Sequence, residues 1–215
     1  MKMVKAVIFD MDGVIIDSNP VHFKAWINVI KPFGINLVLD DFKDLIGKHS
    51  TVVAKHIKEK YGLSPSVLDL VKMKKAKYIE LLPIEVELRS NSVDFIDAVR
   101  QKYSTAVATS EDAKTTKLVM NKFELNDRFD TIFTSDDINK PKPYPEIYLK
   151  TAKALGVEPN ECIVVEDTVP GVESAKRAGM KCIAITGSYN KDKLYEADLI
   201  IDAFSEINAE TISKL

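Results

Sequence analysis

The segment Val7-Ile8-Phe9-Asp10-Met11-Asp12-Gly13-Val14 places two aspartates, one residue apart, directly after a short apolar run and before a glycine. Such a run predicts a buried β-strand, and in extended backbone Asp10 and Asp12 project to the same side. Converging carboxylates repel each other unless a cation lies between them, so this strand end indicates an oxygen-liganded metal such as Mg²⁺. One carboxylate is then placed to attack phosphorus and the other to transfer a proton. A solvated acidic turn is the alternative.

The composition is that of a globular protein. The chain has 215 residues, of which 46% are hydrophobic and 29% charged, and this allows one substantial core and a smaller accessory domain. The net charge is −2 and the pI about 6.0, so no overall basic field is present to bind nucleic acid or an anionic membrane. A small phosphorylated metabolite is therefore the expected partner.

The apolar run before Asp10 is too short for a signal peptide or a membrane span, which predicts a cytoplasmic protein. Cys162 and Cys182 each begin an apolar stretch, and we expect two reduced structural thiols. A disulfide is the alternative if the two strands are parallel neighbours. No sustained heptad pattern occurs, so no particular oligomeric state is predicted.

Short β-branched runs alternate with amphipathic helical patterns, which is typical of an α/β fold with a parallel sheet covered on both faces. The expected strands are Lys5–Phe9, Thr105–Thr109, Thr131–Phe133, Cys162–Glu166, Lys181–Ile185 and Leu199–Ile201. In such a fold the ligand lies beyond the carboxyl ends of the strands.

Residues 16–86 separate the first two strands by far more than one crossover and contain no convincing strand pattern. We expect an all-helical inserted domain here, with residues 1–15 and 87–215 forming the catalytic core. The expected helices are Pro20–Lys31, Asp40–Leu45, Thr51–Tyr61 and Ser66–Leu82. Phe23, Trp26 and Ile30 recur at helical spacing, which predicts packing within the insert. An insert directly after the acidic strand end can close over the site and exclude water.

Two further strand ends carry groups suited to phosphoryl transfer. Thr109 and Ser110 end the second strand before a helix that begins near Asp112, so a hydroxyl and a helix N-terminus together form an anion site. Glu166 and Asp167 end the fourth strand and add carboxylates that suit a Mg²⁺ shell. Helix capping by Ser110, Asp112 or Asp167 is the competing explanation.

A proline-rich loop, residues 139–146, follows the third strand and contains Lys140 and Lys142. Prolines hold its backbone extended and restrict where such a lysine lies. A lysine fixed in this way is suited to neutralise a nucleophilic carboxylate and the charge on a transferring phosphoryl group. A solvated lysine in a loop is the alternative.

Together these four segments resemble the haloacid dehalogenase-like hydrolase superfamily, and within it the group that contains phosphoglycolate phosphatases and beta-phosphoglucomutases. The resemblance covers nearly the whole chain. It implies a Rossmann-like parallel-sheet core with an inserted all-helical cap domain. It also implies that Asp10 is the nucleophile that becomes an aspartyl phosphate and that Asp12 is the general acid/base. Relatives that are true dehalogenases act without Mg²⁺ and lack this second acid.

The resemblance assigns the remaining motifs as well. The hydroxyl of the second motif falls on Thr109, with Ser110 adjacent, and the lysine before Pro-x-Pro falls on Lys142 rather than Lys140. The implied Mg²⁺ ligands are Asp10, Asp12 through its main-chain carbonyl, Glu166 and Asp167.

A phosphatase and a phosphomutase share the aspartyl phosphate and differ in whether water or a sugar hydroxyl accepts the phosphoryl group. His22 and Trp26 match the hinge of beta-phosphoglucomutases, and Lys74 falls where those enzymes place a cap lysine. However, Ser50 stands where the mutases have an arginine that binds the second phosphate, and a serine cannot replace a bidentate guanidinium.

Glu111 and Asp112 would also repel a doubly anionic substrate. We therefore favour a phosphatase that hydrolyses small phosphorylated metabolites, with a phosphomutase as the alternative. A non-catalytic binding module is less well supported, because all four motifs are intact. The candidate substrate contacts are Ser110, His22, Lys48, His49, Lys74 and Glu111.

Overall fold

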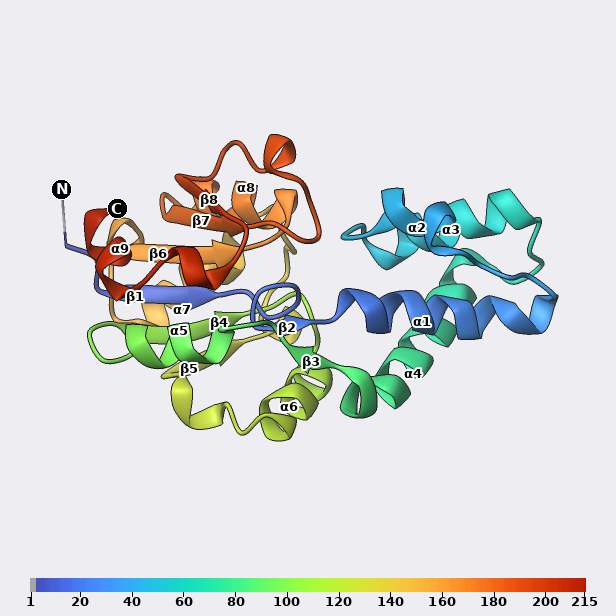
Figure 1. Cartoon of the computed structure of the whole chain (residues 1–215), viewed down its shortest axis with the longest axis horizontal. Helices are drawn as coiled ribbons and strands as arrows, with labels where there is room; N and C mark the ends of the chain where they lie inside the picture. The colour runs from blue at the N-terminus through green and yellow to red at the C-terminus, as the bar shows by residue number, and fades with distance from the viewer. Residues whose placement is uncertain (1–2) are drawn as a thin grey trace. The chain divides into compact units, whose positions relative to one another are not determined.

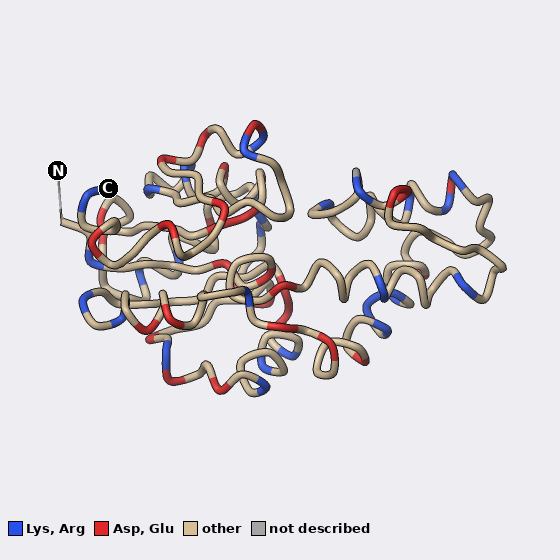
Figure 2. The backbone as a smooth tube through the Cα atoms, in the orientation of Figure 1, with Lys and Arg blue, Asp and Glu red and all other residues tan. Residues whose placement is uncertain are grey.

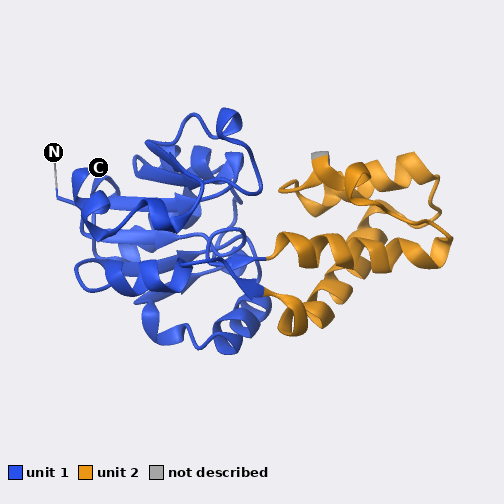
Figure 3. Ribbon diagram, viewed as in Figure 1, with its two compact units in different colours: residues 1–17, 87–215 blue, residues 18–86 orange. Residues whose placement is uncertain are grey.

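The computed structural model describes residues 3–215, and the chain divides into two compact units (Figure 3). A core unit is made of residues 1–17 and 87–215, and a helical unit is made of residues 18–86.

Six parallel strands form the sheet of the core unit, in the order β5-β4-β1-β6-β7-β8 (Figure 1). Their bounds are β1 Ala6–Phe9, β4 Ser104–Ala108, β5 Thr131–Phe133, β6 Cys162–Glu166, β7 Lys181–Ile185 and β8 Leu199–Ile201. Strand β1 is central, and its Ile8 pairs with Ala106 on one side and Val164 on the other. The predicted α/β fold with a parallel sheet is thus confirmed.

Side chains of β1 alternate between two apolar layers. Ile8 belongs to a buried cluster that also contains Tyr148 and Val172, whereas Phe9 packs edge-on against Phe95 on the other side. The core helices are α5 Ser92–Val99, α6 Ala113–Lys122, α7 Glu146–Leu155, α8 Val169–Arg177 and α9 Ala209–Lys214. Because Tyr148 lies on α7, Val172 on α8 and Phe95 on α5, helices cover both faces of the sheet.

A short antiparallel pair lies where the chain leaves and re-enters the core unit. Strand β2, Ile16–Asp17, pairs with β3, Glu87–Leu88. Residues 16 and 17 were predicted to lie in the insert, with no strand there. Two-residue strands leave no periodic pattern to recognise, and pairing with the returning chain keeps them in the core unit.

The helical unit has its own apolar core. Its helices are α1 Asn19–Ile30, α2 Leu39–Phe42, α3 Ser50–Tyr61 and α4 Val67–Glu85. Trp26 and Ile30 are buried together with Ile57 and Leu70, as the helical spacing predicted. Helix α4 continues through Pro83, although its expected end was Leu82. A proline this close to the last turn removes one hydrogen bond without ending the helix.

The charged residues and the cysteines are distributed as in an ordinary globular protein. Figure 2 shows acidic and basic residues interspersed along both units. Cys162 and Cys182 are free and buried, so the alternative of a disulfide is wrong. Among residues 3–215, no helix combines the length and apolar character needed to span a bilayer.

Candidate active site

The carboxyl edge of the core sheet brings together side chains from its central strands. Asp10 directly follows β1, Thr109 follows β4, and Glu166 ends β6 with Asp167 next to it; all four residues are buried. Main-chain hydrogen bonds extend the ladder past the strand ends, since Asp10 N donates to Val165 O at 2.9 Å. The backbone of the sheet therefore fixes where these side chains begin.

Lys142 is the cation at this edge. Its Nζ donates to Asp10 Oδ1 at 2.6 Å, to Glu166 Oε1 at 2.7 Å and to the Ala108 carbonyl at 3.1 Å. Its side chain is only 6% exposed. Lys140 is exposed instead, so the structure places Lys142, and not Lys140, among the acids.

Asp10 lies in a setting that disfavours its charge. Burial raises the pKa of Asp10 to about 8, Glu166 and Asp12 push it in the same direction, and Lys142 opposes the rise. One ammonium group does not compensate the several carboxylates around it. Additional positive charge at this edge would stabilise the ionised form that a nucleophile requires.

Glu166 has five protein donors on its two carboxylate oxygens. Oε1 accepts from Lys142 and from the Tyr148 hydroxyl at 3.0 Å, and Oε2 accepts from Asp167 N, Thr168 N and Thr168 Oγ1 at 2.8–2.9 Å. Burial alone would raise the pKa of Glu166, but Lys142 and the Thr168 donors outweigh it and lower the pKa. A Cβ at Gly171 would lie 1.8 Å from Oε1, so a glycine leaves room for this carboxylate.

Asp167 contrasts with its neighbour. Its Oδ2 accepts a hydrogen bond from the Ser188 hydroxyl, whereas its buried Oδ1 has no hydrogen-bond partner among residues 3–215. Burial, together with Glu166 and Asp10, holds the pKa of Asp167 well above its usual range. A buried carboxylate oxygen without a donor, beside further carboxylates, is a donor set that suits a hard divalent cation.

The turn after β1 is shaped around Asp167. Gly13 has φ +76°, and a Cβ there would lie 1.9 Å from Asp167 Oδ2. Gly13 N donates to Ile16 O at 2.8 Å, and because the preceding peptide is planar and trans, the Asp12 carbonyl points away from Ile16. Glycine is thus required here for both its conformation and its lack of a side chain.

Two hydroxyls follow β4 in different settings. Thr109 is buried, and its Oγ1 accepts from Glu111 N at 3.1 Å, which directs the hydroxyl hydrogen elsewhere. Ser110 is exposed, and Glu111 is half-buried. Asp112 caps α6 by accepting from Thr115 N at 2.7 Å, in agreement with the capping explanation for that residue.

The predicted substrate contacts of the helical unit separate into two kinds. His22 Nδ1 and Lys74 Nζ lie 2.7 Å apart, and the His22 ring stacks on Tyr78 with ring centres 4.1 Å apart. Burial and the nearby ammonium groups lower the pKa of His22 well below its usual value. Lys48 and His49 are exposed, and His49 caps α3 by accepting from Thr51 N at 3.4 Å.

Sequence reasoning missed three polar residues at the core edge. Tyr148 contacts Glu166, Ser188 contacts Asp167, and Arg89 donates to the Gly13 carbonyl. A tyrosine on the inward face of α7 is a signal for a buried hydroxyl that needs a partner. Ser188 and Arg89 give no such signal, because their positions depend on how loops meet in the folded chain.

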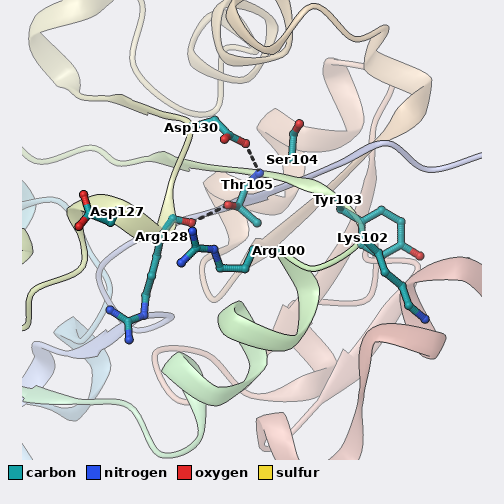
Figure 4. Close-up of a pocket in the computed structure, with 8 residues that line it drawn as sticks. All are labelled: Arg100, Lys102, Tyr103, Ser104, Thr105, Asp127, Arg128 and Asp130. Carbon is teal, nitrogen blue, oxygen red and sulfur yellow. Dashed lines mark hydrogen bonds between the residues drawn. The ribbon is translucent and has the colours of Figure 1, made fainter.

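A cavity of about 310 Å³ lies at the opposite end of β4 from Thr109 (Figure 4). It is lined by Arg100, Lys102, Tyr103, Ser104, Thr105, Asp127, Arg128 and Asp130. Its central groups already bond within the protein: Thr105 N donates to Asp130, and the Thr105 hydroxyl donates to the Arg128 carbonyl. The cavity is therefore separate from the acidic edge.

Comparison with known proteins identifies the family. Residues 7–185 match the model of the family described as haloacid dehalogenase-like hydrolase. The chain belongs to this family. The predicted resemblance is confirmed, including the group with phosphatases and beta-phosphoglucomutases.

Relatives cover nearly the whole chain. The chain is 31% identical over 203 residues to a phosphorylated carbohydrates phosphatase of Thermotoga maritima, covering 92% of this chain and 93% of that protein. A haloacid dehalogenase-like hydrolase of Entamoeba histolytica, 30% identical, superimposes with a TM-score of 0.85 and 98% coverage of both chains. A beta-phosphoglucomutase of Clostridium difficile, 27% identical, gives a TM-score of 0.76 with 99% and 96% coverage. By family and relatives, the chain is classed as a phosphoric monoester hydrolase.

Proposed function

We propose that the acidic edge of the core sheet is the active site of a Mg²⁺-dependent phosphatase that acts on small phosphorylated metabolites through an aspartyl phosphate. The observation that carries this proposal is the Lys142 ammonium group held between Asp10 and Glu166, next to the donor-free oxygen of Asp167. The phosphatase of Thermotoga maritima points to phosphorylated carbohydrates as the first substrates to test.

The proposed roles combine the motif positions of the family with the contacts at the core edge. Asp10 attacks phosphorus, and the bond to the leaving oxygen breaks as the aspartyl phosphate forms. Asp12 donates a proton to that oxygen and later accepts one from the water that hydrolyses the aspartyl phosphate. Lys142 favours the ionised form of Asp10 and balances charge on the phosphoryl oxygens, and Thr109 donates its hydroxyl hydrogen to one of them.

Asp10, Asp167 and the Asp12 carbonyl are the proposed Mg²⁺ ligands. Bound there, Mg²⁺ would offset the carboxylate repulsion and the charge of the phosphoryl group. Glu166 was also expected as a ligand, but its five protein donors favour a different role. We propose that Glu166 positions Lys142 and the main chain around Thr168.

Phosphate release from a panel of small phosphate monoesters, with and without Mg²⁺, tests the proposal. Asp10→Asn should abolish turnover, since an amide is a far weaker nucleophile, while Asp192→Asn on the exposed surface should leave it unchanged. After an acid quench, intact mass spectrometry should detect a phosphoryl adduct on the wild type and none on Asp10→Asn. Mg²⁺-independent turnover, or full activity of Asp10→Asn, would refute the mechanism.

Similarity to a beta-phosphoglucomutase supports a phosphomutase as the second candidate. The two are separated by incubating the enzyme with beta-glucose 1-phosphate and its 1,6-bisphosphate. Conversion to glucose 6-phosphate faster than phosphate release favours the mutase. The phosphatase proposal predicts the reverse, because Ser50 stands where the mutases carry an arginine.

A further inference from the structure

Arg89 lies at the point where the chain re-enters the core unit. It directly follows β3, and its backbone N donates to Ile15 O at 2.9 Å. The side chain is half-buried. Its position is therefore tied to the turn that follows β1, residues 10–16.

The guanidinium group of Arg89 joins two loops. Nη1 donates to the Gly13 carbonyl at 2.5 Å, and Nη2 donates to the Thr186 carbonyl. Thr186 begins the loop after β7, residues 186–188. Gly187 has φ +146°, and a Cβ there would lie 2.9 Å from Nη1, so this glycine leaves room for the guanidinium.

Both loops contact Asp167. In the turn after β1, Gly13 lies so close to the Asp167 carboxylate that a Cβ would overlap it. In the loop after β7, the Ser188 hydroxyl donates to Asp167 Oδ2. The carboxylate is therefore held by two segments that Arg89 fastens to each other, and its Oδ1 is left with no protein donor among residues 3–215.

We propose that Arg89 is a positioning residue that fastens the turn 10–16 to the loop 186–188 and thereby orients Asp167 for a divalent cation. This inference rests on the proposed function. Arg89 donates to main-chain oxygens and acts on the site through Gly13 and Ser188.

Arginine suits this position because its donors form a rigid planar fork. Two nitrogens of one guanidinium reach the two carbonyls simultaneously. A lysine ammonium is a compact charge on a flexible stem and does not reproduce the fork. Arg89→Lys therefore keeps the charge and removes the connection between the loops.

The test measures Mg²⁺ binding with and without turnover. We expect Arg89→Lys to raise the Mg²⁺ concentration for half-maximal phosphate release roughly tenfold or more, with little change in kcat at saturating Mg²⁺ or in substrate KM. The rise in melting temperature that Mg²⁺ gives without substrate should shrink in parallel. Arg100→Lys, on an exposed arginine, is the matched control and should behave as wild type.

Ser188→Ala is the second variant, and it carries the test if Arg89→Lys does not fold. It should weaken Mg²⁺ binding in both measurements. Because Arg89 holds the loop that carries Ser188, the two substitutions share one route to Asp167, and the Mg²⁺ affinity of the double variant should lie within about threefold of that of the single variant that binds Mg²⁺ more weakly. Independent effects would multiply, and this result would overturn the proposal.

Failure of the inference is distinguishable from failure of the proposed function. A Mg²⁺-dependent wild type with unchanged Mg²⁺ affinity in Arg89→Lys overturns the role of Arg89 alone. A wild type whose activity and melting temperature both ignore Mg²⁺ overturns the two proposals together.

Discussion

The core unit and the helical unit each bury a lysine, and the two lysines are held differently. Lys142 bonds to two carboxylates and a main-chain carbonyl at the ends of paired strands. Lys74 lies on a helix beside the His22 ring nitrogen and over the Tyr78 ring, with Nζ 4.6 Å from the ring centre. Neither of these two contacts of Lys74 is with a carboxylate.

This difference separates positions fixed by backbone from positions fixed by side chains. The groups around Lys142 begin at adjacent strand ends, so their spacing follows from the sheet register. Two groups next to Lys74, the rings of His22 and Tyr78, are side chains of α1 and α4, and they can be exchanged without moving a strand. Conservative changes in the core should therefore reduce catalysis, and changes in the helical unit should alter substrate preference.

Lys142→Met should give the largest effect. It leaves Asp10 and Glu166 buried without their shared cation, and we expect kcat to fall roughly a thousandfold. The free energy of unfolding should fall by about 3–5 kcal/mol. Steady-state kinetics and chemical denaturation measure the two effects. Lys140→Met, in the same loop, is the control, and an equal loss in that variant would contradict the assignment.

Gly171→Ala should give the next largest effect. The added Cβ would overlap the Glu166 carboxylate, whose displacement also shifts Lys142, and we expect about a hundredfold loss of kcat. Gly156→Ala is the matched control: it places alanine at φ +70° in open space and should cost about 1–2 kcal/mol of stability without loss of kcat. If Gly156→Ala lost as much kcat as Gly171→Ala, the loss would come from general destabilisation and not from the contact with Glu166.

Tyr148→Phe should have a moderate effect. The ring remains near the Lys142 ammonium, which lies 4.9 Å from its centre, but Glu166 loses the hydroxyl donor. We expect kcat to fall roughly fivefold with an unchanged KM. Tyr148→Leu, which removes the ring as well, should be worse, and Ile147→Val controls for packing on the same helix. A wild-type kcat in Tyr148→Phe would show that the hydroxyl does not contribute to catalysis.

Lys74→Met should give the smallest effect on catalysis and the clearest effect in the helical unit. Burial and the charges of Lys74 and Lys75 lower the pKa of His22, so loss of one charge should raise that pKa toward its usual value. NMR titration of the imidazole signals measures the shift. We expect KM for phosphorylated carbohydrates to change about twofold to fivefold at constant kcat. Lys72→Met, on an exposed lysine of the same helix, is the control, and a His22 titration in Lys74→Met identical to that of the wild type would contradict the electrostatic cause.

The sequence predicted the features that depend on local pattern. Runs such as Cys162–Glu166 identify buried strands, and once the strands are parallel, Asp10, Thr109 and Asp167 must lie at one edge. The proline loop could be recognised from the sequence. Only the folded chain shows that Lys142 contacts both Asp10 and Glu166. Glu166 looked like a metal ligand because two of its five donors, Lys142 and Tyr148, lie far from it in the sequence and reach it only in the folded chain.

Features that arise from packing between distant segments could not be predicted from the sequence. Pairing of β2 with β3 assigns Ile16 and Asp17 to the core unit, although neither stretch is long enough to show a period. Arg89 and Ser188 lie in loops with no motif of their own. Their contacts depend on loops that follow different strands coming together at one edge.

The two native thiols have a practical consequence. Cys162 and Cys182 are 1% and 0% exposed, and burial raises the pKa of Cys162 to about 12, so maleimide reagents should leave both unlabelled in the folded protein. Val52 in the helical unit and Tyr195 in the core unit are exposed sites for introduced cysteines. A pair of fluorophores on Val52→Cys and Tyr195→Cys would then measure whether the distance between these two sites changes during turnover.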